Sequence, residues 1–200
     1  MLNANLRLSS EERQLLLDEG FILTKRSILA KTEKLFGDLS EVFRQQVLAQ
    51  KMNNADFMQL TPKLARGENY NGLPWVMMDY PRLFTKTDIC AIRCFFWWGH
   101  YCSITLHLSG HYQERYQTRL FDFLKDDKES EWMFSVAKDP WQHMISHENY
   151  HPGDQVDHFL EAWRSSPYLK IAKKIPLTQW DQLDDFFTDN YAVLLSLLRG

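Results

Sequence analysis

Residues 88–108 read DICAIRCFFWWGHYCSITLHL, and this stretch says most about the fold. Apolar, β-branched and aromatic side chains run through it, as is typical of strands covered on both faces. One strand of this length would be unusual, because strands mostly have about 3–10 residues. Gly99 and His100 place a glycine first in a two-residue turn of type II′. We therefore predict a hairpin of two antiparallel strands that folds back at these residues.

The two-residue turn fixes which side chains of the hairpin share a face. One face would carry Ala91, Arg93, Phe95 and Trp97 together with Cys102, Ile104, Leu106 and Leu108. The other would carry Ile92, Cys94, Phe96 and Trp98 together with Tyr101, Ser103, Thr105 and His107. Because both faces are largely apolar, we expect other elements to cover both of them.

The chain before the hairpin begins with helical patterns. Over 1–55, Ser9 and Glu12 form a capping box, Gly20 and Gly37 are expected helix stops, and apolar residues recur at spacings of three and four. This predicts a helical hairpin or triplet.

The predicted sheet region spans 65–137, with strands at 75–80 and 132–137, a short helix at 116–124 and a turn-rich loop at 66–72.

The C-terminal part, 139–198, is expected to be helical. Asp139 and Pro140 are typical of a helix start, and this helix would run toward Pro152. Further helices are predicted at 154–164, 167–174 and 178–198. Together these elements predict a single α+β domain over 1–200, an antiparallel β-meander of about four strands flanked by N-terminal and C-terminal helices.

Charge argues against several classes of partner. The 200 residues contain 23 lysines and arginines against 26 acidic residues, and a net charge of −3 favours neither a nucleic acid nor an anionic membrane. The densest basic cluster, Lys170, Lys173 and Lys174, is short and fits a solvated helix face. No apolar run approaches the ~20 residues that span a bilayer. No nucleic-acid or membrane partner is therefore predicted.

The cysteines and the N-terminal residues indicate in which cellular compartment the protein is expected. Cys90, Cys94 and Cys102 are an odd number in one apolar stretch, without the spacing of a zinc knuckle, and are expected to be reduced core residues. Residues 1–7 contain no apolar signal region. We therefore expect a cytoplasmic protein whose partner is a small molecule or another protein. The sequence leaves its oligomeric state open.

The segment HENYH at 147–151 fits the H-E-x-x-H pattern, in which two histidines one helical turn apart bind zinc. His147 and His151 would be ligands, and His143 or a downstream residue would be the third. Glu148 would be the general base that activates a metal-bound water. In these five residues and the order of elements, the chain resembles the zincin metallopeptidases. A zinc-dependent hydrolase is therefore the alternative function, with zinc as its cofactor.

Two features of the same segment argue against this zinc site. Pro152 follows directly and disfavours helical geometry at the residue before it, and Asn149 is a weak helix former. The longer pattern with a third histidine is also not met, because Gly153 comes one position early and His158 one position late. An amphipathic helix end with solvated histidines fits the same residues.

Arg93 is the one charged side chain among large apolar neighbours in the predicted strand 89–98. A buried guanidinium needs a carboxylate, a phosphate or several carbonyls, so Arg93 either anchors an anionic ligand or pairs internally, for example with Asp79. On the next strand, Ser103, Thr105 and His107 form a polar row. Such a row either lines a pocket or packs beneath another element. We take Arg93, Ser103 and His107 as candidate ligand-binding residues.

Aromatic residues make up 14% of the chain, and five of them surround the hairpin. We expect these rings in the core rather than on an exposed platform that stacks bases or sugars. The predicted function is a small-ligand binding or interaction module with an aromatic-walled pocket and no cofactor. The sequence leaves open whether the chain is an enzyme.

Overall fold

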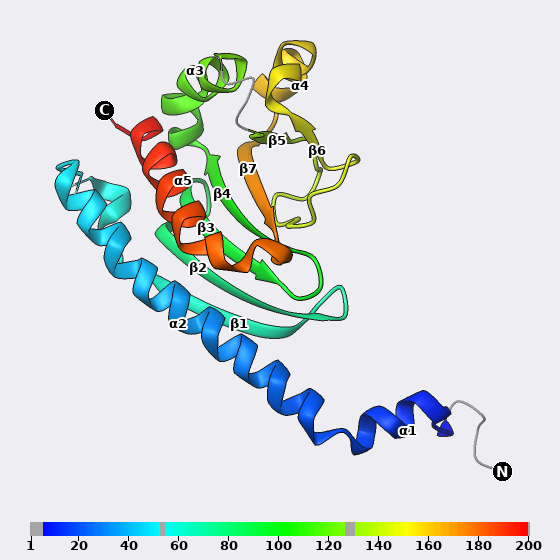
Figure 1. The fold of residues 1–200 in the computed structure, drawn as a ribbon. Coiled ribbons are helices and arrows are strands. Elements are labelled where there is room, and N and C mark those ends of the chain that lie inside the picture. The colour runs from blue at the N-terminus through cyan, green and yellow to red at the C-terminus, as the bar shows by residue number, and fades with distance from the viewer. Residues whose placement is uncertain (1–5, 53–54, 127–130, 200) are drawn as a thin grey trace.

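The computed structural model describes residues 6–52, 55–126 and 131–199 and shows an α+β fold, with helices packed on an antiparallel sheet (Figure 1). In the described residues, seven strands form one sheet in the order β1-β2-β3-β4-β7-β5-β6, more than the predicted four. The strands are β1 (Lys63–Tyr70), β2 (Leu73–Phe84), β3 (Ile89–Trp97), β4 (Tyr101–Ser109), β5 (Met133–Ser135), β6 (Tyr150–Pro152) and β7 (Tyr168–Pro176). The helices are α1 (Ser10–Leu17), α2 (Glu19–Ala49), α3 (His111–Asp126), α4 (Leu160–Arg164) and α5 (Leu183–Leu197), with short 3-10 helices at Asp56–Met58, Gly153–Phe159 and Leu177–Gln182.

Strands β3 and β4 form the predicted hairpin, but the turn is one residue longer than predicted. Trp97 pairs with Tyr101, so three residues connect the strands, and Gly99 among them has a φ of +74°. The longer turn shifts the register by one residue and exchanges the faces of β4. Arg93 consequently lies opposite Thr105, and the predicted grouping of side chains across the hairpin was wrong.

Helix α2 replaces two predicted helices and carries Gly20 and Gly37 within it. Its buried residues continue past Gly37 as a single stripe, Leu29, Thr32, Phe36, Leu39, Phe43 and Val47. Packing of this stripe on the sheet outweighs the ~1 kcal/mol cost of a helical glycine, so Gly37 does not end the helix. The capping box of Ser9 and Glu12 is confirmed at the start of α1, and Asp18 then caps α2.

The other expectations for the predicted sheet region, 65–137, are met with one exception. The strand at 75–80, the helix at 116–124 and the strand within 132–137 are confirmed as parts of β2, α3 and β5. The expected loop at 66–72 lies mostly in β1. The chain turns at Asn71 and Gly72, which both have positive φ and connect β1 to β2, and the N–H of Gly72 donates to Oδ1 of Asn69 at 3.0 Å.

Two predicted C-terminal helices are wrong. The stretch 167–174 lies in β7, which pairs with β4 along its whole length. The helix from Asp139 toward Pro152 is not formed, because residues 136–149 cross the sheet as an irregular segment, called the cover segment below. The helix at 178–198 is confirmed as a 3-10 turn followed by α5, and 154–164 is a 3-10 helix followed by α4.

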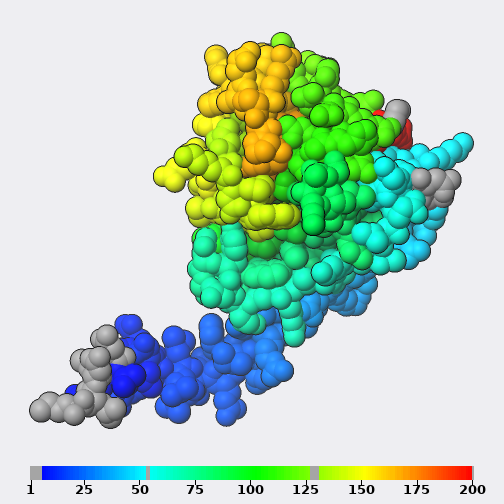
Figure 2. Space-filling view, turned by 180° about the vertical axis from the view of Figure 1, so that it is seen from behind, coloured from blue at the N-terminus to red at the C-terminus, as the bar shows by residue number. Residues whose placement is uncertain are grey.

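The two faces of the sheet are covered differently. Helices α2, α3 and α5 pack on one face and form the main core, in which the three cysteines are buried, as predicted, and are not joined to one another (Figure 1). The cover segment, yellow-green in the reverse view of Figure 2, lies over the other face. A smaller apolar cluster there contains Phe95, Trp97, Tyr101, Ile145, Tyr150 and Ala172. In the part of the chain that the structure describes, no helix is long and apolar enough to cross a membrane.

Candidate functional site

A group of polar side chains lies on the sheet face beneath the cover segment. Asp79 of β2, Arg93 of β3 and Thr105 of β4 are direct cross-strand neighbours, and His107 of β4 pairs with Lys170 of β7 in the adjacent row. Directly paired residues of antiparallel strands point to the same side of the sheet. The three-residue hairpin turn therefore brings Arg93 and His107 to one face, where the shorter turn would have separated them.

Arg93 is held by Asp79 in a bidentate ion pair. Its Nε and Nη2 donate to the two carboxylate oxygens at 2.7 Å each, and both side chains are largely buried. This is the internal pair that the sequence offered as one of two roles for Arg93. Nη1 donates to Nε2 of His143 at 2.9 Å. Because a guanidinium can only donate, Nε2 must be unprotonated. Burial, with the charges of Lys170 and Arg93, lowers the pKa of His143 to about 2.

Lys170 is the second buried cation of this face, with 2% of its surface exposed. Its Nζ donates to the backbone carbonyls of Pro140 at 3.1 Å and Gln142 at 2.7 Å, both in the cover segment. None of the ion pairs among the described residues includes Lys170. Burial and the charge of Arg93 lower the pKa of Lys170 to about 7, against a smaller opposing effect of Asp139. Lys170 therefore changes charge near neutral pH.

His107 is buried, and its Nε2 has no hydrogen-bond partner among the described residues. Its ring packs edge-on against Trp141 and Tyr168. Burial, followed by the charges of Lys170 and Arg93, lowers the pKa of His107 to about 3. The imidazole is therefore neutral at physiological pH and can donate one N–H. A buried polar atom without a partner costs about 1–3 kcal/mol, which a ligand that bonds to it would relieve.

These side chains line a small cavity of about 10 Å³. Its walls are Arg93, Thr105, His107, His143 and Lys170, together with Phe84, Ala91 and Trp141. A volume of about 10–15 Å³ holds one species of the size of a water molecule. Trp141 and Phe84 are the exposed wall residues, at 48% and 39%, and their rings pack against each other at 5.9 Å between centroids.

Two tyrosines fasten the cover segment to the sheet beside this cavity. The hydroxyl of Tyr70 donates to Oε1 of Gln142 at 2.6 Å and accepts from the backbone N–H of His143 at 2.9 Å. The hydroxyl of Tyr101 donates to the carbonyl of His143 at 3.1 Å and accepts from the N–H of Ile145 at 2.7 Å. Burial raises the pKa of Tyr101 to about 12, so this hydroxyl keeps its proton. Entry of a larger ligand would require the cover segment to move.

The chemistry of the cavity suits binding of an anion better than proton transfer. Arg93 is largely buried and pairs with Asp79, whereas the buried Lys170 bonds to two backbone carbonyls and forms no ion pair among the described residues. The pKa values of His107 and His143 lie far below neutral, whereas a general acid or base works best with a pKa near the working pH. The face therefore carries excess positive charge and spare N–H donors.

The structure brings some of the predicted ligand-binding residues together. Arg93 and His107 line the cavity, whereas Ser103 lies on the same sheet face outside the residues that line it. Lys170 was missed, because it was assigned to a solvated helix face. Its strand has a signal in the sequence: β-branched residues at 171 and 175 lie between prolines at 167 and 176.

The segment 147–151 does not form the helix that a zinc site of this pattern needs. His147 and Glu148 are exposed in a turn, and His151 lies in β6 with its ring stacked on Phe159 at 4.3 Å between centroids. His143, the predicted third ligand, bonds to Arg93. Within residues 6–52, 55–126 and 131–199, no three His, Cys, Asp or Glu side chains are grouped so as to hold a metal ion.

A larger groove of about 640 Å³ lies near the hairpin turn. Tyr101, Trp132 and Met133 are among its walls, and Nζ of Lys174 lies 5.5 Å from the centroid of the Tyr101 ring. This groove is similar in kind to the predicted aromatic-walled pocket. Arg93, Ser103 and His107 are not among its lining residues, so the aromatic groove and the polar cavity are separate places.

Comparisons of the chain with known protein families, with curated proteins and with solved structures find no match. The geometry of the polar cavity is therefore the basis for the function proposed below.

Proposed function

We propose that this protein is a binding module for a small anion, held in the cavity that Arg93, His107 and Lys170 line beneath the cover segment. The observation that carries the proposal is the charge of this group: Asp79 pairs with Arg93, whereas Lys170 forms no ion pair among the described residues and bonds to backbone carbonyls. Burying a cation without a counter-charge is costly, and a bound anion would offset that cost.

Each of the three side chains has a donor to spare. Lys170 uses two of its three N–H groups on backbone carbonyls, which leaves one. Arg93 uses three of its five N–H groups on Asp79 and His143, which leaves two. His107 adds an N–H when its proton is on Nε2. Hydrogen bonds from charged donors are about twice as strong as neutral ones, which favours an anion over a neutral ligand.

The size of the cavity favours a monatomic anion. A space for one water-sized species takes chloride, which is somewhat larger than water, with a small outward adjustment of the walls, whereas phosphate or a carboxylate needs far more room. Binding of a polyatomic anion would require Trp141 and the cover segment to move outward. We therefore expect a halide to bind to the closed form described here.

Thermal unfolding in different sodium salts at one ionic strength tests this proposal. Chloride and bromide should raise the Tm above its value in gluconate, whose anion is too large for the cavity. A tenfold excess over Kd corresponds to about 1.4 kcal/mol and about 3–6 °C for a chain of this size. An equal Tm in all anions, halides and phosphate included, would rule the proposal out. A larger rise with phosphate would mean that the cover segment opens for a polyatomic ligand.

A pair of variants on β7 shows where the anion acts. Lys170→Met removes a cation of the cavity while keeping the length of the side chain, and it should abolish the halide-dependent rise in Tm. Lys174→Met removes a lysine from the same strand at an exposed position outside the cavity, and it should leave the rise unchanged. Loss of the effect in both variants would indicate a general effect of surface charge.

The zinc-dependent hydrolase remains a prediction from the sequence alone, and no contact described above supports it. Elemental analysis of protein purified without a histidine tag tests it separately. A stoichiometric amount of zinc would favour the hydrolase, whereas less than about a tenth of an equivalent would argue against it.

A further inference from the structure

The aromatic groove near the hairpin turn differs from the polar cavity in size and in lining. Its volume of about 640 Å³ lies within the range of about 300–1,000 Å³ that is typical of small-molecule sites. Tyr101, Met133, Pro152 and Pro176 give it an apolar lining. The hydroxyl of Tyr101 bonds to the backbone of the cover segment, so its ring is the part that can contact a ligand. The groove therefore offers apolar contacts to a ligand.

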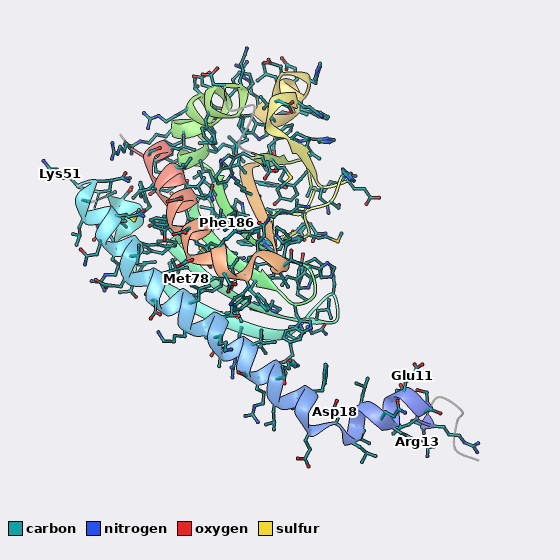
Figure 3. The ribbon with its side chains drawn as sticks, in the orientation of Figure 1. Glu11, Arg13, Asp18, Lys51, Met78 and Phe186 are labelled. Carbon is teal, nitrogen blue, oxygen red and sulfur yellow. The ribbon has the colours of Figure 1, made fainter. Side chains whose placement is uncertain are left out.

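The groove opens to solvent at the end of β7 that leads into α5. Its wall residues Pro152, Lys174 and Pro176 are exposed. An adjoining hollow of about 740 Å³ shares Lys174 and Pro176 with it and extends to Phe186, which Figure 3 labels near the start of α5. A ligand can therefore enter the groove without movement of the cover segment.

Two exposed side chains of opposite charge, Glu131 and Lys174, lie on the wall of the groove. None of the ion pairs among the described residues includes either of them. Nζ of Lys174 lies 5.5 Å from the centroid of the Tyr101 ring, which places the ammonium group against the apolar lining. The groove therefore presents a positive and a negative charge beside apolar walls.

The ends of β5 and β7 bring these two charges near each other. Met133 pairs with Ala172, and Glu131 and Lys174 lie two positions further along on the two segments. The ladder between the strands stops at Met133, and Glu131 has a φ of +60°, so the backbone leaves the strand conformation there. The carboxylate and the ammonium group consequently lie on one groove without bonding to each other, and both are available to a ligand.

We propose that this groove binds a free α-amino acid with a large apolar side chain. Lys174 would bind its carboxylate, Glu131 would bind its ammonium group, and the apolar lining would contact its side chain. An α-amino acid carries both charges on groups attached to one carbon, which matches opposite charges at neighbouring positions. In a peptide the terminal charges lie further apart, by up to about 3.3–3.6 Å per residue, so a long peptide matches less well. The groove shares no lining residue with the anion cavity, so this site is independent of the function proposed above.

Calorimetric titration of the full chain with L-phenylalanine tests the proposal. Binding should be saturable, with a Kd below about 1 mM. Three related compounds separate the contacts, because phenylpropionate lacks the ammonium group, phenethylamine lacks the carboxylate and glycine lacks the side chain. Each should bind at least about 10-fold more weakly, since each loses a hydrogen bond between charged groups or the apolar contact.

Matched variants show whether binding occurs in this groove. Lys174→Met and Glu131→Gln should each raise the Kd for L-phenylalanine at least about 10-fold. Lys173→Met and Asp185→Asn are the controls, because they remove the same charges from the wall of the adjoining hollow and do not line the groove. Both controls, and Lys170→Met in the anion cavity, should keep the Kd within about twofold of the wild type. Circular dichroism should show an unchanged fold in every variant.

Three results would overturn the proposal. The first is the absence of saturable binding of L-phenylalanine up to about 10 mM. The second is binding of phenylpropionate or phenethylamine as tight as that of L-phenylalanine, which would show that the two charges do not act together. The third is an unchanged Kd in both Lys174→Met and Glu131→Gln, which would place the ligand elsewhere on the protein.

Discussion

The guanidinium of Arg93 has a structural role in the fold and, in the function proposed above, a binding role as well. Three of its N–H groups hold Asp79 and His143, and the others face the cavity side of the sheet. The sequence could not separate the two roles, because one buried arginine among apolar residues fits both. The structure shows the ion pair of Arg93 with Asp79 and places Lys170 on the same face without a carboxylate partner among the described residues. The proposal of an anion site rests on this second cation.

Removal of the carboxylate should be costly. Asp79→Asn leaves the Arg93 cation buried without a counterion, and we expect the free energy of unfolding to fall by about 3–5 kcal/mol. Asp38→Asn, in the exposed pair of Lys34 and Asp38, is the control and should cost less than about 1 kcal/mol. Urea unfolding of the two variants makes the comparison. Similar losses in both would mean that the Asp79 pair is not buried as described.

Lys170 should make stability depend on pH in a definite direction. Its pKa is about 7 in the folded chain, and in the unfolded chain it returns to its ordinary value of about 10.4. Between these values the unfolded chain binds more protons, so the free energy of unfolding rises with pH. Between pH 7 and pH 9, the free energy of unfolding of the wild type should rise by about 2 kcal/mol more than that of Lys170→Met. A difference between the two proteins that does not change with pH would contradict the lowered pKa.

The affinity for the anion should also depend on the charge of Lys170. It should fall as the pH increases, whereas the free energy of unfolding rises. In the proposed site the protonated form of Lys170 would bind the anion, so the Kd for chloride should rise as pH increases above about 7. The lowered pKa values of His107 and His143 keep both imidazoles neutral over this pH range. Calorimetric titrations at pH 6 and pH 9 measure the change. Equal affinity at both values would exclude Lys170 as an anion ligand.

At the scale of elements, the sequence predicted the C-terminal helix α5 and the central strands well. It failed where one residue or a tertiary contact determines the structure, as at Gly37 inside α2. The hairpin at 88–108 was found, but a turn one residue longer exchanged the faces of β4. Strand β7 was taken for a helix, since a short lysine-rich stretch shows no clear period. The cover segment starts with a good capping sequence, yet its backbone is held by Lys170, Tyr70 and Tyr101, and such long-range bonds leave no local signal.

Two glycines should respond oppositely to the same substitution because of the elements they lie in. A Cβ at Gly37 meets no described atom within 4 Å, so Gly37→Ala should stabilise the protein by about 0.5–1 kcal/mol through helix propensity. A Cβ at Gly67 in β1 would lie 2.6 Å from the indole of Trp75, so Gly67→Ala should cost about 1–3 kcal/mol. Thermal unfolding of both variants gives the comparison. Changes of the same sign would show that one of these environments is wrong.

At the scale of the whole molecule, the two faces of the sheet differ in the side chains that they carry and in the elements that cover them. The face that the helices cover holds the main apolar core and most of the buried apolar residues. The sequence predicted this packing of helices on a sheet. The other face combines a small apolar cluster with buried charge under an irregular segment, and this is where the candidate site lies. The zinc prediction did not lead there, because it relied on a local helix that the cover segment does not form.

Soaking bromide into crystals of this protein tests most directly whether the cavity binds an anion. Bromide scatters X-rays anomalously, so its position can be identified from its own signal and told apart from water. We expect an anomalous peak in the cavity, in hydrogen-bonding contact with Lys170, Arg93 and His107, that disappears in Lys170→Met. Peaks confined to the molecular surface, with none in the cavity of the wild type, would contradict the assignment of an anion site.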